Sequence, residues 1–217
     1  MADREPLDDR ADVQPSPAAV SFVTTEHFTL QGARSSTVAE STGRATMFLS
    51  AVSGGLIALG LMASAAGIGR AFYALALVLL PTLAFVGVVT FDRVLQTGVE
   101  DHEYARRIAH LRGYYFQYAP ELVDHLLSVP SGQRLGIQGL RGNPWQRFVT
   151  VAGMVSVVTA VLAGSGAGIL GAVLSGANLV AALVTGVVVG GAVMVILMHI
   201  QAATWRRVSA SGLFAEE

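Results

Sequence analysis

Long uncharged stretches are the dominant pattern along the chain. The first lies between Arg44 and Arg70, and the second lies between Arg70 and Asp92. A third uncharged stretch runs from 148 to 198. A helix that crosses a bilayer needs about 20 consecutive, mainly apolar residues. Each of the first two stretches suits one crossing, whereas the third is more than twice that length and must fold back on itself.

The expected bend in the third stretch is its segment rich in glycine and serine, residues 164–178. This bend gives a third span near 148–170 and a fourth near 178–200. We therefore expect an all-α integral membrane protein whose four transmembrane helices form two helical hairpins. In chain order, the expected parts are a disordered tail at 1–24, a juxtamembrane helical segment at 25–44, the first hairpin at 45–91, a helical segment at 92–147, the second hairpin at 148–201 and a tail at 202–217.

Arginine is distributed unevenly about these spans. All fourteen cationic residues are arginine, which is typical of a GC-rich, bacterial genome. Seven of them lie in 92–147, and two lie in each flank just before the first span and just after the fourth. Only Arg70 lies on the opposite side. Because cytoplasmic loops carry the excess of Lys and Arg, we expect a plasma-membrane protein with both termini and 92–147 in the cytoplasm.

Interface anchors are expected on that same cytoplasmic side. Trp145 precedes the third span, and Trp205 follows the fourth together with Arg206 and Arg207. Indole rings prefer the headgroup layer of a bilayer. These residues therefore agree with the orientation that the arginine distribution predicts.

Small residues recur inside the spans at the spacing that lets helix backbones approach closely. Gly186 and Gly190 form a G-x-x-x-G pair in the fourth span, and Gly54 and Gly60 each pair with a serine four residues away in the first. Such positions serve packing within one chain or a homo-oligomeric face, and the spacing leaves both open. Pro81, midway along the second span, is a candidate hinge because proline removes a helix hydrogen bond.

The helical segment after the second span carries an apolar seam at alternating spacings of four and three. This heptad spacing is suited to packing against another helix. Its partner is a second copy, another protein, or the short amphipathic helix expected just after it. The seam consists of Tyr104, Ile108, Leu111, Tyr115 and Tyr118.

Few residues offer chemistry. Charged residues make up 13% of the chain, about half the usual share for a soluble domain, and there is no cysteine. No metal-binding spacing or phosphate-binding loop occurs, and the arginines are mixed with acids, which argues against nucleic-acid binding. We expect no catalytic, cofactor-binding or metal-binding residues.

The spans carry no well-buried charge, and ion-coupled transporters usually need one. The sequence therefore favours a small non-enzymatic membrane protein that acts as an assembly, regulatory or effector component through its cytoplasmic helical segment. The alternatives are a homo-oligomeric pore or channel and, less favoured, a small-molecule transporter. Its partners would be the lipid bilayer, a second copy of the chain, and a protein bound at the cytoplasmic segment.

Reporter fusions test the expected topology. Fusions after Arg70 and near Ser175 should report the outside of the cell, because their flanks hold the fewest arginines. Fusions after Gly113 and after Arg207 should report the cytoplasm. An external signal from the Gly113 fusion would contradict the two-hairpin arrangement.

Overall fold

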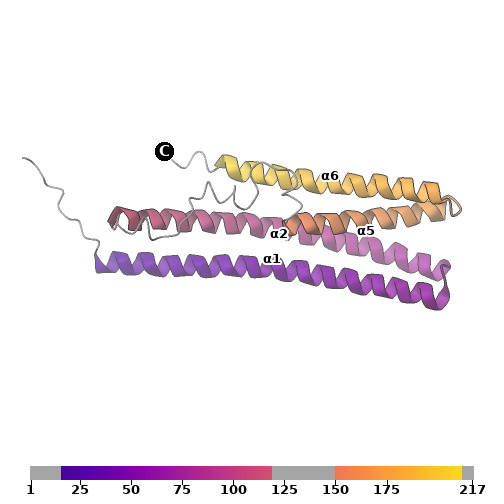
Figure 1. Ribbon diagram of the computed structural model, residues 1–217, viewed down its shortest axis with the longest axis horizontal. Helices are drawn as coiled ribbons and strands as arrows, with labels where there is room; N and C mark the ends of the chain where they lie inside the picture. The colour runs from indigo at the N-terminus through magenta and orange to yellow at the C-terminus, as the bar shows by residue number, and fades with distance from the viewer. Residues whose placement is uncertain (1–15, 119–149, 212–217) are drawn as a thin grey trace, which may run out of the picture.

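The computed structural model describes residues 16–118 and 150–211 (Figure 1). Within these ranges the chain forms four helices and no strand: α1 (Pro17–Ala66), α2 (Arg70–Tyr118), α5 (Val151–Leu174) and α6 (Leu179–Ser211). Each is long and apolar enough to cross a membrane. The described part of the chain is therefore all-helical, with four candidate membrane spans by length and composition, as the uncharged stretches predicted. Predictions that concern 1–15, 119–149 and 212–217, Trp145 among them, lie outside the described residues.

The helices are arranged as a row. Each packs along its neighbour in the chain, α1 on α2, α2 on α5 and α5 on α6, whereas α1 touches α5, and α2 touches α6, only slightly. Figure 1 shows the two short connections, 67–69 and 175–178, at the same end of the long helices, on the right. The central position in this row therefore belongs to α2 and α5, and α1 and α6 are the outer helices.

α1 begins earlier than the sequence suggested. The Ser16 hydroxyl accepts a hydrogen bond from the Ala19 amide at 3.2 Å, and Pro17 occupies the first turn, a combination that starts helices well. Residues 17–24, expected in a disordered tail, are therefore helical. The expected juxtamembrane segment and first span form one unbroken helix, which ends at Gly67 with φ 71°.

α1 and α2 are much longer than a bilayer is thick. With 50 and 49 residues, each extends about 75 Å, against about 30 Å of hydrocarbon. The residues beyond the length needed to cross a bilayer are largely polar and lie at one end of each helix. We call these parts the two-helix arm: residues 17–44 of α1 and 92–118 of α2, which lie side by side (Figure 1).

The connection between α5 and α6 is shorter than expected. Only 175–178 leave the helix, although the bend was expected anywhere in 164–178. The Asn178 side chain starts α6 by accepting hydrogen bonds from the amides of Val180 and Ala181 at 3.0 and 3.2 Å. At its other end, α6 runs on to Ser211, beyond the boundary expected at 201.

Three glycines of α5 face α6 at close range: Gly164, Gly168 and Gly171. A Cβ atom at Gly164 would lie 2.7 Å from the Gly186 carbonyl oxygen, and one at Gly190 would lie 3.0 Å from that of Ala160. Gly168 faces α6 in the same way. Close backbone contact through small residues is the usual means by which helices associate in lipid, and here it joins α5 to α6.

α1, α2 and α5 meet at Gly87 of α2. Phe48 of α1 is 2% exposed, and Thr159 of α5 is fully buried. A Cβ atom at Gly87 would collide with the Thr159 hydroxyl and would lie 2.9 Å from the Phe48 ring. The absence of a side chain at Gly87 therefore sets how closely the first two helices approach α5.

Substitution of Gly87 tests this contact. Alanine favours a helix over glycine by about 1 kcal/mol, but at Gly87→Ala we expect a net loss of stability because overpacking costs about 1–3 kcal/mol. Gly54→Ala is the matched control, since nothing lies within 4 Å of a Cβ there. Thermal unfolding in detergent measures both. A Gly87→Ala protein as stable as the control would contradict the packing described.

Candidate partner-binding surface

The two-helix arm has a narrow core of its own. Leu30 and Thr37 of α1 are buried there, together with Ala105 and Ile108 of α2. The Thr37 hydroxyl donates to the Arg34 carbonyl oxygen at 2.7 Å, so this buried polar group is satisfied within α1. The arm is therefore a packed pair of helices, and its outer surfaces are available for contacts.

A bidentate ion pair joins the two helices of the arm. Arg34 of α1 donates from Nε and Nη2 to the two carboxylate oxygens of Asp101 on α2, at 2.7 and 3.3 Å. The side chains are 30% and 20% exposed, so solvent screens this pair less than a surface pair. Arg34 precedes the 67–69 connection by almost the same number of residues as Asp101 follows it. Matching opposite charges about that turn could have revealed the pair from sequence.

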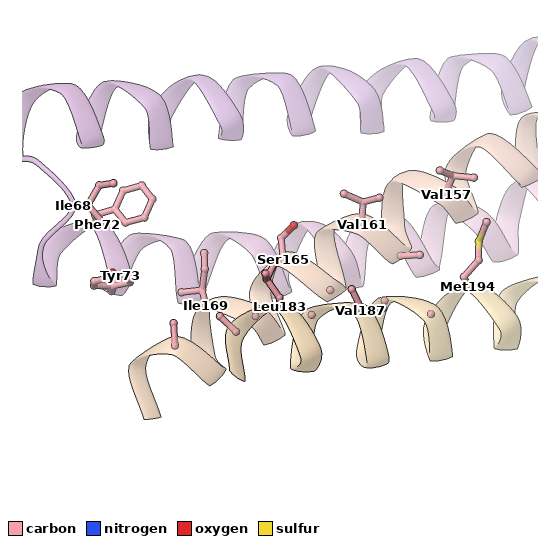
Figure 2. Close-up of a pocket in the computed structure, with 18 residues that line it drawn as sticks. Ile68, Phe72, Tyr73, Val157, Val161, Ser165, Ile169, Leu183, Val187 and Met194 are labelled. Atoms are coloured by element: carbon pink, nitrogen blue, oxygen red, sulfur yellow. The ribbon is translucent and has the colours of Figure 1, made fainter. Parts of the chain in front are cut away.

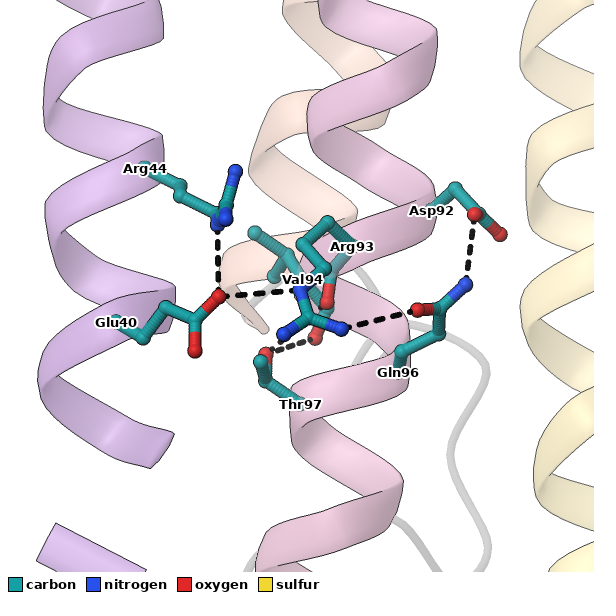
Figure 3. Close-up of polar contacts among 7 residues, drawn as sticks. All are labelled: Glu40, Arg44, Asp92, Arg93, Val94, Gln96 and Thr97. Carbon is teal, nitrogen blue, oxygen red and sulfur yellow. Dashed lines mark hydrogen bonds and ion pairs between the residues drawn. The ribbon is translucent and has the colours of Figure 1, made fainter. Parts of the chain in front are cut away.

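A second cross-link lies at the base of the arm, where α1 and α2 become uncharged (Figure 3). Glu40 of α1 accepts hydrogen bonds from Arg44 at 2.9 Å and from Arg93 of α2 at 3.1 Å. These two bonds, Arg44 first, lower the pKa of Glu40 and keep its carboxylate ionised. On α2, Arg93 also reaches Gln96 at 3.4 Å, and Gln96 donates to Asp92 at 2.8 Å.

The end of α6 rests against the arm. Trp205 lies edge-on to His102 of α2, with ring centroids 6.1 Å apart. Burial lowers the pKa of His102, and the Arg106 charge lowers it further, although Asp101 acts in the opposite direction. Trp205, expected to anchor at the membrane interface, thus contacts a protein helix, which single-sequence patterning did not indicate.

The predicted seam is partly used inside the chain. Ile108 is 3% exposed and lines a groove together with Gln31 and Arg34 of α1. Tyr104 and Leu111 are half-buried. The last two seam residues belong to α2, but their side chains lie outside the described part of the chain: Tyr115 and Tyr118.

One flank of the arm exposes large apolar side chains. Val20, Phe28 and Val38 of α1 are 41%, 67% and 53% exposed. At 3.6 residues per turn they fall within about 80° of one another around the helix. We call these three residues the apolar flank. Large apolar side chains that gather on one side of a surface can mark an interaction site, and this flank was hidden in the sequence among serine and threonine.

A groove of about 510 Å³ runs beside the apolar flank, with Val38 on its rim, Ile108 in its lining and Arg112 at one side. Arg112 has no carboxylate partner among residues 16–118 and 150–211. The pKa of nearby His27 is lowered by burial and then by the Arg112 charge. The flank and groove together offer apolar contacts next to a positive charge.

The small residues predicted for packing separate into two groups. Gly186 and Gly190 lie between α6 and α5, within one chain. Gly54 and Gly60 are exposed on α1, and nothing lies within 4 Å of a Cβ at either position.

The remaining predicted residues are placed as follows. Pro81 lies inside α2 against Gly166 of α5, and its role as a hinge stays a prediction. Arg206 and Arg207 are exposed near the end of α6, and their role as interface anchors also stays a prediction.

No group of three or more His, Asp or Glu side chains in the described ranges is placed to hold a metal ion. No family model, curated protein or solved structure matches the chain. The function must therefore be inferred from the arm, the apolar flank and the apolar helices themselves.

Charge reversal tests whether the Arg34–Asp101 pair holds the arm together. Arg34→Asp should speed hydrogen exchange in residues 17–44, because it places two carboxylates side by side. Adding Asp101→Arg should restore protection, and the recovered energy should be up to about 1 kcal/mol. Reversing the exposed Glu103–Arg107 pair, which lies within α2 alone, is the control. A double reversal that fails to recover would contradict the pairing.

Proposed function

We propose that the chain crosses a bacterial plasma membrane four times as two hairpins, with both termini and the two-helix arm in the cytoplasm. The uncharged parts of α1 and α2, residues 45–66 and 71–91, extend about 33 and 32 Å, which matches the hydrocarbon thickness of about 30 Å. Charges begin at Arg44 and Asp92, so the arm starts where the bilayer ends. The arginine asymmetry supports the orientation.

Within this arrangement, the proposed function is non-enzymatic binding of a protein partner by the arm, as an assembly or regulatory component of the membrane. The observation that carries the proposal is the apolar flank. Exposed apolar side chains on the spans face lipid, but Val20, Phe28 and Val38 lie on a segment that the proposed topology places in water. Exposing such a surface to water is unfavourable, and a bound partner would remove that cost.

The chemistry of the flank defines the kind of partner. Three apolar side chains spaced along one side of the arm, beside a groove, suit the apolar face of an amphipathic helix laid along the arm. Arg112 at the side of the groove favours an acidic residue on that helix. A pair of helices held by two cross-links suits this purpose. Because the surface is already formed, binding loses little conformational entropy. No comparable feature of the described residues supports the pore or the transporter alternative.

Site-specific crosslinking in native membranes tests the proposal. A photoreactive residue at Gln31, which is exposed and lies between Phe28 and Val38, should form an adduct with one defined protein. Phe28→Ser should reduce this adduct strongly, because it removes the largest apolar contact of the flank. The matched control is Phe22→Ser, since Phe22 is 76% exposed but lies about 120° from Phe28 around α1.

The result can contradict the proposal in two ways. An adduct formed only with a second copy of the chain would identify the flank as a self-association surface. An adduct that survives Phe28→Ser, or is lost equally with Phe22→Ser, would mean that the flank does not select the partner. Ion conduction by the purified protein in liposomes would instead support the pore alternative.

A further inference from the structure

An apolar groove of about 690 Å³ follows α5 and α6 and reaches the start of α2 (Figure 2). Ile68, Phe72 and Tyr73 lie at one end, and Val157 and Met194 lie at the other. Between these ends, glycines of both helices expose backbone in place of side chains. The volume falls within the range of about 300–1,000 Å³ that is typical of ligand-binding pockets.

The groove is longer than one membrane leaflet and begins near one membrane surface in the proposed topology. Its lining on α5 runs from Ala172 to Val157, which corresponds to about 22 Å along a helix. Half of the hydrocarbon layer is about 15 Å thick. One end of the groove lies beside the 67–69 connection, where the proposed topology places the outer membrane surface. A ligand in the groove would therefore run from that surface toward the middle of the bilayer.

A positive charge stands beside this outer end. Arg70 is exposed and opens α2; it does not itself line the groove, but in the chain it lies between Ile68 and Phe72, which both do. It is the single charged residue of segment 45–91. Within the described chain, Arg70 has no carboxylate partner. A guanidinium binds phosphate oxygens through paired hydrogen bonds, so Arg70 complements a phosphate at the outer membrane surface.

We infer that this groove binds one phospholipid with an anionic headgroup, its phosphate at Arg70 and one acyl chain along α5 and α6. The acyl chain fits because the lining is apolar and because Gly191, where a Cβ would meet open space, leaves room beside the α6 backbone. The inference rests on the proposed membrane insertion and orientation, but it is independent of any partner of the arm. Its failure would leave the apolar flank and the crosslinking result unaffected.

Native mass spectrometry of the full-length protein in detergent tests the inference, with phosphatidylglycerol and phosphatidylcholine titrated separately. We expect one phosphatidylglycerol adduct that forms more readily than the phosphatidylcholine adduct. Arg70→Gln should weaken phosphatidylglycerol binding about fivefold, the effect of one basic residue near a membrane surface. It should also remove the preference over phosphatidylcholine.

Variants that fill the groove with a larger side chain provide a second test. Gly191 lines the groove, and a Cβ there meets open space, so Gly191→Leu should displace the acyl chain without disturbing helix packing. Val187→Trp, at a lining position that is 72% exposed, is an independent filling variant. Gly54→Leu is the matched control, because Gly54 is equally unobstructed but lies outside the groove. Thermal unfolding verifies that each variant is folded.

The expected pattern is loss of the adduct in both filling variants and its retention in Gly54→Leu. Persistence of the adduct in the filling variants would overturn the inference. Equal loss in Gly54→Leu would also overturn it, since it would show only unspecific lipid around the helices. A change of oligomeric mass in the filling variants, in place of a lost lipid, would overturn it by identifying a second copy of the chain as the occupant.

Discussion

The close approach of three helices at Gly87 is the contact on which the arrangement depends. α1 packs on α2 and α6 packs on α5, but the two pairs are joined through the α2–α5 interface. At its centre, Phe48 and the buried hydroxyl of Thr159 occupy the space that a side chain at Gly87 would need. Thr159 donates to the Val155 carbonyl oxygen at 2.7 Å, so this polar group is satisfied without a partner on another helix. In lipid, where burial from water supplies no force between helices, such close packing holds the pairs together.

α1 and α2 continue to pack against each other in the arm, but the interactions between them there are of a different kind. Beyond Arg44 and Asp92 the α1–α2 interface holds ion pairs as well as apolar side chains, as expected for a segment that the proposed topology places in water. The Arg34–Asp101 and Glu40–Arg93 pairs fix the distance and register of the two helices at two positions along the arm. Because each helix is continuous from the arm into the apolar part, the arm and the apolar helices share one register. A partner held on the arm is therefore held at a fixed position relative to the spans.

Sequence patterning identified the helices well, because an uncharged, mainly apolar run of about 20 residues is the defining requirement of a membrane-crossing helix. It did not show that α1 is continuous from Pro17, since serine and threonine tolerate both helix and coil, and the start depends on the Ser16 cap. It also could not assign the glycines. Gly54 and Gly190 have equivalent spacing motifs, yet Gly190 faces α5 and Gly54 faces no protein. Spacing places residues on one face of a helix, but only the fold determines what lies opposite that face.

The outer helix α6 has the least buried apolar window of the four candidate spans. No residue is buried in the most apolar 18-residue window of α6, whereas 33% of the corresponding window in α2 is buried. Its protein contact there is a strip of backbone opposite the glycines of α5. Such a helix would be unstable in water, because its exposed apolar surface would favour aggregation, but in hydrocarbon that surface carries no penalty. The groove follows this same contact, and the glycines that admit α6 so closely form part of its lining beside side chains such as Val161 and Val187. Tight helix packing and the groove thus lie along one helix contact, and in the proposed membrane lipid would cover this exposed side of the row.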